Sequence, residues 1–226
     1  MTSQNRKRPR NIDCYKPAEQ IYIFCEGEKT EPQYFQEFAN AIRKNPIYKN
    51  SVSVAPIGVG KSTLCVVNDA QEYAEKNNIK GANIWCVYDK DDFPEDDFNS
   101  AEQKLTSLRE KDKNKYYAAW SNQCVEYWFI LHFDYYIANN HRTDYIKHLN
   151  DKFSNIGLDK YKKNNKELFD ILLKYGNPKQ AITWAKKRME SFSGCTPSKS
   201  APATKVYELV LTLAEYLPSS IKDKFI

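Results

Sequence analysis

Several acidic side chains directly follow apolar runs of the sequence. Glu26 follows IYIFC, Asp89 closes NIWCVYD with Asp91 two residues later, and Glu126 comes shortly after YYAAWS. Carboxylates that lie close together repel one another, and their pKa values rise unless a cation neutralises them. Oxygen ligands without a supporting set of His or Cys favour Mg²⁺ or Mn²⁺ over zinc. If the fold brings these acids together, we expect a divalent-cation site.

Each acid also has a purely structural explanation. Glu26 and Glu28 suit the positive end of a helix that follows them, and the stretch DKDDFPEDD can form an exposed acidic turn. Taken one at a time, the motifs leave both explanations open. A common location at the ends of neighbouring strands would favour the metal site.

The stretch APIGVGKST, residues 55–63, ends like a nucleotide-binding P-loop. That loop needs a glycine, then four residues, then Gly-Lys-Ser, because its backbone N–H groups cradle phosphates. Here Ala55 replaces the glycine and Pro56 lacks a backbone donor. We therefore interpret the stretch as a turn between a strand and a helix. An NTPase that uses Lys61 is the less favoured alternative.

Four pairs of a strand and a helix are expected to position these residues. The predicted strands are QIYIFCEGE, SVSVAPI, ANIWCVYD and YYAAWS, and the helices after them are residues 30–44, with Thr30 as N-cap, 62–77, 95–111 and 124–133. Such alternation predicts an α/β fold with a mostly parallel four-stranded sheet flanked by helices. The acids would then meet at the carboxyl edge of the sheet, where open α/β folds place their sites.

Composition narrows the class of protein. The chain has 226 residues, 41% hydrophobic content and six widely spaced Cys residues. We expect neither a signal peptide nor a membrane-spanning stretch. We expect a cytoplasmic protein with reduced thiols. We predict a basic, disordered arm over residues 1–17, the α/β domain over residues 18–135, and a helical region packed on it over residues 136–226. The loop SFSGCTPSKSAPATK precedes the last predicted helix, residues 206–217.

The net charge is +5, and the basic residues form clusters. Lysine and arginine clusters on arms or helices suit sequence-independent contacts with nucleic-acid phosphates, although they also mark ordinary solvated faces. The candidate nucleic-acid-binding residues are Arg6, Lys7, Arg8 and Arg10 in the arm and Lys162, Lys163, Lys186, Lys187 and Arg188 in the helical region.

The motifs CEGEKTEPQYF, CVYDKDD and SNQCVEYWFILHF, in this order, resemble the RloB family of bacterial restriction and abortive-infection loci. The resemblance runs from about Ile21 to the final helix and includes PATKVYELV. It implies a divergent TOPRIM domain, in which Glu26 corresponds to the glutamate after the first strand and Asp89 and Asp91 to the Asp-x-Asp motif.

The resemblance implies an Mg²⁺-dependent nuclease that cuts DNA or tRNA in anti-phage defence, together with an AAA- or ABC-type ATPase encoded nearby. On this hypothesis Glu26, Asp89 and Asp91 bind one or two ions, and Glu126 binds the second ion or accepts a proton from the attacking water. Lys29 would offset charge on the phosphate. The alternative is a catalytically silent module that binds nucleic acid or an effector.

Overall fold

The fold was analysed in a computed structural model, which describes residues 19–226. The predicted arm and its candidate residues Arg6, Lys7, Arg8 and Arg10 lie outside the described residues. The strands are β1 (Glu19–Cys25), β2 (Val52–Gly58), β3 (Asn83–Asp89), β4 (Lys115–Asn122) and β5 (Ala203–Thr204). The helices are α1 (Thr30–Lys44), α2 (Thr63–Lys76), α3 (Glu95–Lys111), α4 (Glu126–Ile130), α5 (Arg142–Asn155), α6 (Leu168–Tyr175), α7 (Pro178–Glu190), α8 (Val206–Ala214) and α9 (Ser219–Lys222), with a 3₁₀ turn over Pro197–Lys199.

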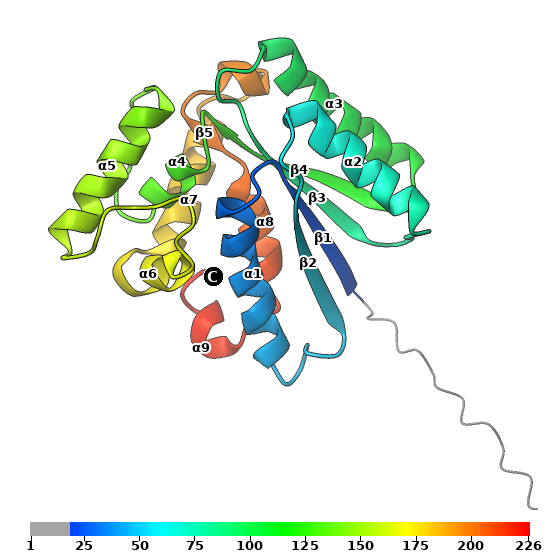
Figure 1. Ribbon diagram of the computed structural model, residues 1–226, viewed down its shortest axis with the longest axis horizontal. Coiled ribbons are helices and arrows are strands. Elements are labelled where there is room, and N and C mark those ends of the chain that lie inside the picture. Colours follow the sequence, from blue (N-terminus) through cyan, green and yellow to red (C-terminus); the bar gives the residue numbers. More distant parts are fainter. Residues whose placement is uncertain (1–18) are drawn as a thin grey trace, which may run out of the picture.

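The strands form one sheet in the order β2-β1-β3-β4-β5, and β1 to β4 are parallel (Figure 1). The prediction of a mostly parallel α/β sheet is confirmed, but its four strands are corrected to five. Residues 203–204, predicted to lie in a loop, pair antiparallel with β4. A strand of two residues is too short to show a periodic sequence pattern. It can be recognised only from its pairing with β4 in the structure.

Side chains of the central strands alternate between two hydrophobic cores, one on each face of the sheet. Ile23 of β1 and Val87 of β3 pack in the core that contains α1 and the helices after β4. Phe24 and Cys86 point into the core formed with α2 and α3. Because successive side chains of a strand point to opposite faces, such runs are hydrophobic throughout when both faces are covered.

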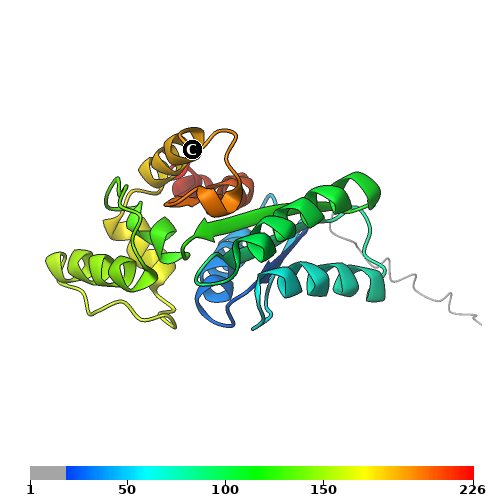
Figure 2. The same cartoon turned by 90° about the horizontal axis from the view of Figure 1, so that it is seen from above.

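The region after residue 135 is mainly helical, as predicted, and also supplies β5. In both views α5 lies far from α2 and α3, at the other end of the molecule (Figures 1 and 2). Residues of α1, α5, α6, α7 and α8 share one core. No helix within residues 19–226 combines the length and apolar character needed to cross a bilayer.

The strand order places a crevice at the carboxyl ends of β1 and β3. From β1 the chain passes through α1 to β2 on one side, and from β3 it passes through α3 to β4 on the other. Connections that leave two adjacent parallel strands in opposite directions open a crevice between them, where α/β proteins bind ligands. Glu26 and Asp89 lie at these two strand ends.

Candidate acidic metal site

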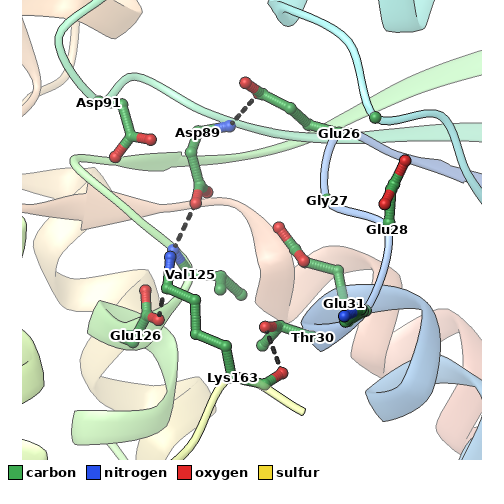
Figure 3. Close-up of a pocket in the computed structure, with 12 residues that line it drawn as sticks. Glu26, Gly27, Glu28, Thr30, Glu31, Asp89, Asp91, Val125, Glu126 and Lys163 are labelled. Carbon is green, nitrogen blue, oxygen red and sulfur yellow. Dashed lines mark hydrogen bonds and ion pairs between the residues drawn. The ribbon is translucent and has the colours of Figure 1, made fainter.

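A cavity of about 380 Å³ lies at this crevice, and we call it the acid pocket (Figure 3). The structure brings all four predicted carboxylates and Lys29 to its walls. Its lining includes Glu26, Glu28, Lys29, Thr30, Glu31, Asp89, Asp91, Glu126 and Lys163. The acids come from the ends of β1 and β3 and the first turns of α1 and α4.

Glu26 is held across the crevice by the neighbouring strand. Its backbone N–H donates to the carbonyl of Val87 at 2.9 Å, which extends the pairing of β1 with β3 by one residue. Its Oε2 accepts a hydrogen bond from the backbone N–H of Asp89 at 3.0 Å. Burial, with smaller contributions from Asp91 and Glu31, raises the pKa of Glu26 to about 7. The carboxylate therefore gains proton affinity from its setting.

Asp89 is buried at the end of β3, with 9% of its surface exposed. Its Oδ2 accepts a hydrogen bond from the backbone N–H of Val125 at 3.1 Å. Its Oδ1 is buried without a hydrogen-bond partner among the described residues. Burial, followed by repulsion from Glu31 and Asp91, raises its pKa well above the ordinary value for aspartate. A buried, unpartnered oxygen of this kind is a candidate cation ligand.

Asp91 is held by residues that are distant in the sequence. Its backbone has φ of 39°, in the left-handed region, and its N–H donates to the carbonyl of Gln123 at 2.9 Å. Its Oδ2 accepts from Nη1 of Arg142 at 2.7 Å, while its Oδ1 is buried and has no partner among the described residues. Burial raises the pKa of Asp91, and the neighbouring Arg142 opposes that rise.

Glu126 opens α4 and is almost fully buried, with 1% of its surface exposed. Its Oε1 accepts a hydrogen bond from Oη of Tyr161 at 3.0 Å and lies 3.9 Å from Nζ of Lys163. Both partners come from the segment between α5 and α6. The carboxylate is therefore oriented by a part of the chain that follows it by more than thirty residues.

Glu31 is a further carboxylate of the acid pocket, which also contains Glu28, and the sequence motifs did not identify Glu31 as a site residue. It lies in the first turn of α1 with 6% of its surface exposed. Burial, then repulsion from Glu126, raises its pKa to about 7, although Lys163 opposes the rise. A Cβ atom on Gly27 would clash with its carboxylate, so a side chain at Gly27 would displace the carboxylate of Glu31. The sequence feature that could have identified Glu31 is an acidic residue in the first turn of the helix that follows β1.

Two cations lie at the rim of the acid pocket. Lys29 and Lys163 both line it and are exposed to solvent. Thr30, predicted as the N-cap of α1, is instead the first helical residue, and its hydroxyl donates to the carbonyl of Lys163 at 2.6 Å. The contact joins the start of α1 to the segment that carries Lys163.

The other basic candidates lie elsewhere. Lys162 lines a separate cavity next to the acid pocket. Lys186, Lys187 and Arg188 belong to α7 and line neither cavity. Nζ of Lys187 lies 5.1 Å from the ring centre of Tyr135. Arg188 donates to the carbonyl of Pro202 at 3.2 Å, so its guanidinium takes part in internal packing.

The P-loop alternative conflicts with the geometry of β2. Ala55 to Gly58, which would have to form the start of a phosphate-binding loop, are strand residues paired with β1. Only Val59 to Ser62 connect β2 to α2. Nζ of Lys61 pairs with Asp69 at 2.9 Å. Backbone groups used in a sheet ladder cannot also cradle a phosphate, so we do not propose an NTPase.

The carboxylates surround the acid pocket without forming a finished coordination shell. Within residues 19–226, no three Asp, Glu, His or Cys side chains are arranged to hold a metal ion. Asp89 and Asp91 nevertheless each keep an unpartnered oxygen, and carboxylate oxygens are the ligands that Mg²⁺ and Mn²⁺ prefer. The chemistry of the donor set, carboxylate oxygens of which two are unpartnered among the described residues, fits such an ion.

Comparison with known proteins identifies the family. The model for the family described as RloB-like protein matches residues 21–213, which is most of the chain. No curated protein and no solved structure matches significantly. The match includes every residue that lines the acid pocket.

Proposed function

Because the chain belongs to the RloB-like protein family, we propose that it is a nuclease that cleaves phosphodiester bonds in DNA or tRNA with Mg²⁺ or Mn²⁺ bound in the acid pocket. The observation that carries the proposal is the gathering of six carboxylates around one cavity at the crevice between β1 and β3. The finer assignment to a TOPRIM domain and a role in anti-phage defence follow from the resemblance of the motifs.

The electrostatics of the acid pocket favour a bound cation. The pKa values of Glu26, Glu31, Asp89 and Asp91 are all raised, with burial as the largest cause. A divalent cation would offset both the burial and the mutual repulsion of their ionised forms. Asp89 and Asp91 would offer their unpartnered Oδ1 atoms, and Glu26 and Glu31 would complete the donor set from the β1–α1 side.

A bound Mg²⁺ or Mn²⁺ would supply a Lewis acid for the phosphate and lower the pKa of the attacking water. Glu126, whose Oε1 accepts a hydrogen bond from Tyr161, would bind a second ion or accept a proton from that water. Lys29 and Lys163 at the rim would balance the charge of the phosphate, a task for which a lysine ammonium is suited. The ATPase partner implied by the resemblance would act on this site from outside the chain.

The test compares wild type with the variant Asp89→Asn, Asp91→Asn. Mg²⁺ and Mn²⁺ are titrated calorimetrically, and both proteins are then incubated with total tRNA and with plasmid DNA. We expect the variant to lose metal binding and to cleave at least about 100-fold more slowly, because both unpartnered oxygens belong to these residues.

The matched control is Asp96→Asn, Asp97→Asn, which removes two exposed acids from the first turn of α3. It should bind metal and cleave like wild type. Metal binding that survives in the Asp89, Asp91 variant would refute the metal site. Metal binding by wild type without cleavage of either polymer would favour the silent module over the nuclease.

A further inference from the structure

The segment between α5 and α6, residues 158–167, forms one rim of the acid pocket and carries four lysines within the seven residues 160–166. We call it the lysine strap. Lys163 lines the acid pocket, whereas its neighbours Lys162 and Asn164 line a second cavity of about 430 Å³. The strap therefore separates two adjacent cavities, one acidic and one lined by basic and amide side chains.

Hydrogen bonds to three other elements hold the backbone of the strap in place. The backbone N–H of Tyr161 donates to Oδ1 of Asn150 in α5 at 2.8 Å. The hydroxyl of Tyr161 donates to Glu126 at 3.0 Å, and the carbonyl of Lys163 accepts from Thr30 at 2.6 Å. The side chains of the strap are thus presented from a fixed backbone.

The cationic side chains of the second cavity are not used for internal ion pairs. Lys160, Lys162 and Lys166 are exposed, and no ion pair within residues 19–226 includes them. The lining also contains the amides Asn164 and Asn165 and the carboxylates Asp159 and Glu167. Three ammonium groups against two carboxylates leave an excess of positive charge beside the acid pocket.

We propose that the second cavity binds a backbone phosphate of the polynucleotide next to the phosphodiester held in the acid pocket. This inference rests on the proposed function and extends it from the reacting bond to the flanking strand. Adjacent residues of the strap face the two cavities, so neighbouring phosphates of one strand can occupy both. Lysine ammonium groups and amide N–H groups are suitable donors for phosphate oxygens.

The positive charge of the lysine strap also offsets the repulsion between the acid pocket and a negatively charged polynucleotide. The six carboxylates of the acid pocket repel a polyanion, and a bound divalent ion would offset that repulsion only at the reacting phosphate. The strap supplies fixed positive charge within one residue of Lys163. The basic residues of α7 do not fill this role, since they line neither cavity.

The experiment compares Lys160→Gln, Lys162→Gln, Lys166→Gln with the matched control Lys76→Gln, Lys111→Gln, Lys113→Gln. The control lysines are exposed and lie at or just beyond the ends of α2 and α3, close to where β3 and β4 begin. Lys163 is left unchanged because it lines the acid pocket. Binding of fluorescein-labelled single-stranded DNA and of tRNA is measured by anisotropy in EDTA across a series of salt concentrations.

We expect the strap variant to bind more weakly than wild type and to show a smaller dependence of log K on log salt concentration. Loss of the single phosphate contact in the second cavity lowers the slope by about 0.7–0.9. The control variant should retain the wild-type slope. Circular dichroism melting curves show whether each variant is folded.

Equal slopes and affinities for the strap and control variants would overturn the inference and leave the proposed nuclease intact, provided that wild type cleaves with Mg²⁺. A slope reduced only in the strap variant, with no cleavage by wild type, would sustain the phosphate site and count against the nuclease. Weaker binding of a mononucleotide, with unchanged binding of both polymers, would also overturn the inference.

Discussion

Asp91 depends on residues that lie outside the acid pocket. One of its carboxylate oxygens is paired with Arg142 at 2.7 Å, and the other is buried and unpartnered. Arg142 also lies 3.4 Å from Asp92. An arginine that fixes one oxygen of a carboxylate determines where the other oxygen points.

We therefore predict that Arg142→Ala weakens Mn²⁺ binding about 10- to 100-fold, as is usual when a partner of a metal ligand is lost. Arg142→Lys should recover part of the affinity, because lysine keeps the charge but not the fork of donors. Calorimetric titration measures both. The control is Arg43→Ala, which removes an exposed arginine of α1. Equal affinities of the Arg142→Ala and Arg43→Ala variants would contradict the prediction.

The turn from β1 to α1 combines a strand end, a glycine and two acids of the pocket. A side chain at Gly27 would meet the carboxylate of Glu31, and Glu31 is buried in the first turn of α1. The absence of a side chain at Gly27 thus leaves room for the carboxylate of Glu31. The sequence CEGE already marked this turn, but not the acid that its glycine accommodates.

We predict that Gly27→Ala lowers the free energy of unfolding by about 1–3 kcal/mol, because the added methyl group displaces the buried carboxylate of Glu31. The same change in a Glu31→Ala background should cost much less, because the clashing carboxylate is gone. Urea unfolding of the two single variants and the double variant measures this coupling. Strictly additive effects would show that Gly27 does not serve to accommodate Glu31.

For the molecule as a whole, the raised pKa values predict how stability depends on pH. Glu26 and Glu31 have folded-state pKa values of about 7, whereas an unperturbed glutamate titrates near 4.5. Between these values the folded protein holds protons that the unfolded chain has lost. The free energy of unfolding of the metal-free protein must then fall as pH rises from about 5 through 7.

We expect a decrease of about 1–3 kcal/mol for each of these carboxylates, since one pKa unit corresponds to about 1.4 kcal/mol. Urea unfolding in EDTA at a series of pH values measures it. The free energy of unfolding should fall less steeply with pH in the double variant Glu26→Gln, Glu31→Gln than in a control double variant. The control is Glu72→Gln, Glu110→Gln, which alters exposed helical residues. Mg²⁺ should stabilise wild type more at pH 8 than at pH 5.5. Parallel pH profiles of the two variants would contradict the assignment.

Much of the fold follows from local patterns. Apolar runs of strand length, alternating with amphipathic helices, were enough to predict β1 to β4 and α1 to α3, because each pattern reflects burial against neighbouring layers. The same patterns placed Glu26 and Asp89 at strand ends, and parallel strands bring their carboxyl ends to one edge. The predicted helix over residues 124–133 is shorter, Glu126–Ile130, since a turn follows.

The remaining features depend on contacts between distant parts of the chain. The pairing of β5 with β4, the ion pair of Arg142 with Asp91 and the hydrogen bond of Tyr161 with Glu126 join residues 35 to 83 positions apart. None has a local periodicity or composition that marks it. Glu31 became a site residue only when packing buried it beside the other acids. Local sequence therefore determines which elements form and that Glu26 and Asp89 lie at strand ends. Tertiary packing decides which further side chains line the acid pocket, orient its carboxylates and raise their pKa values.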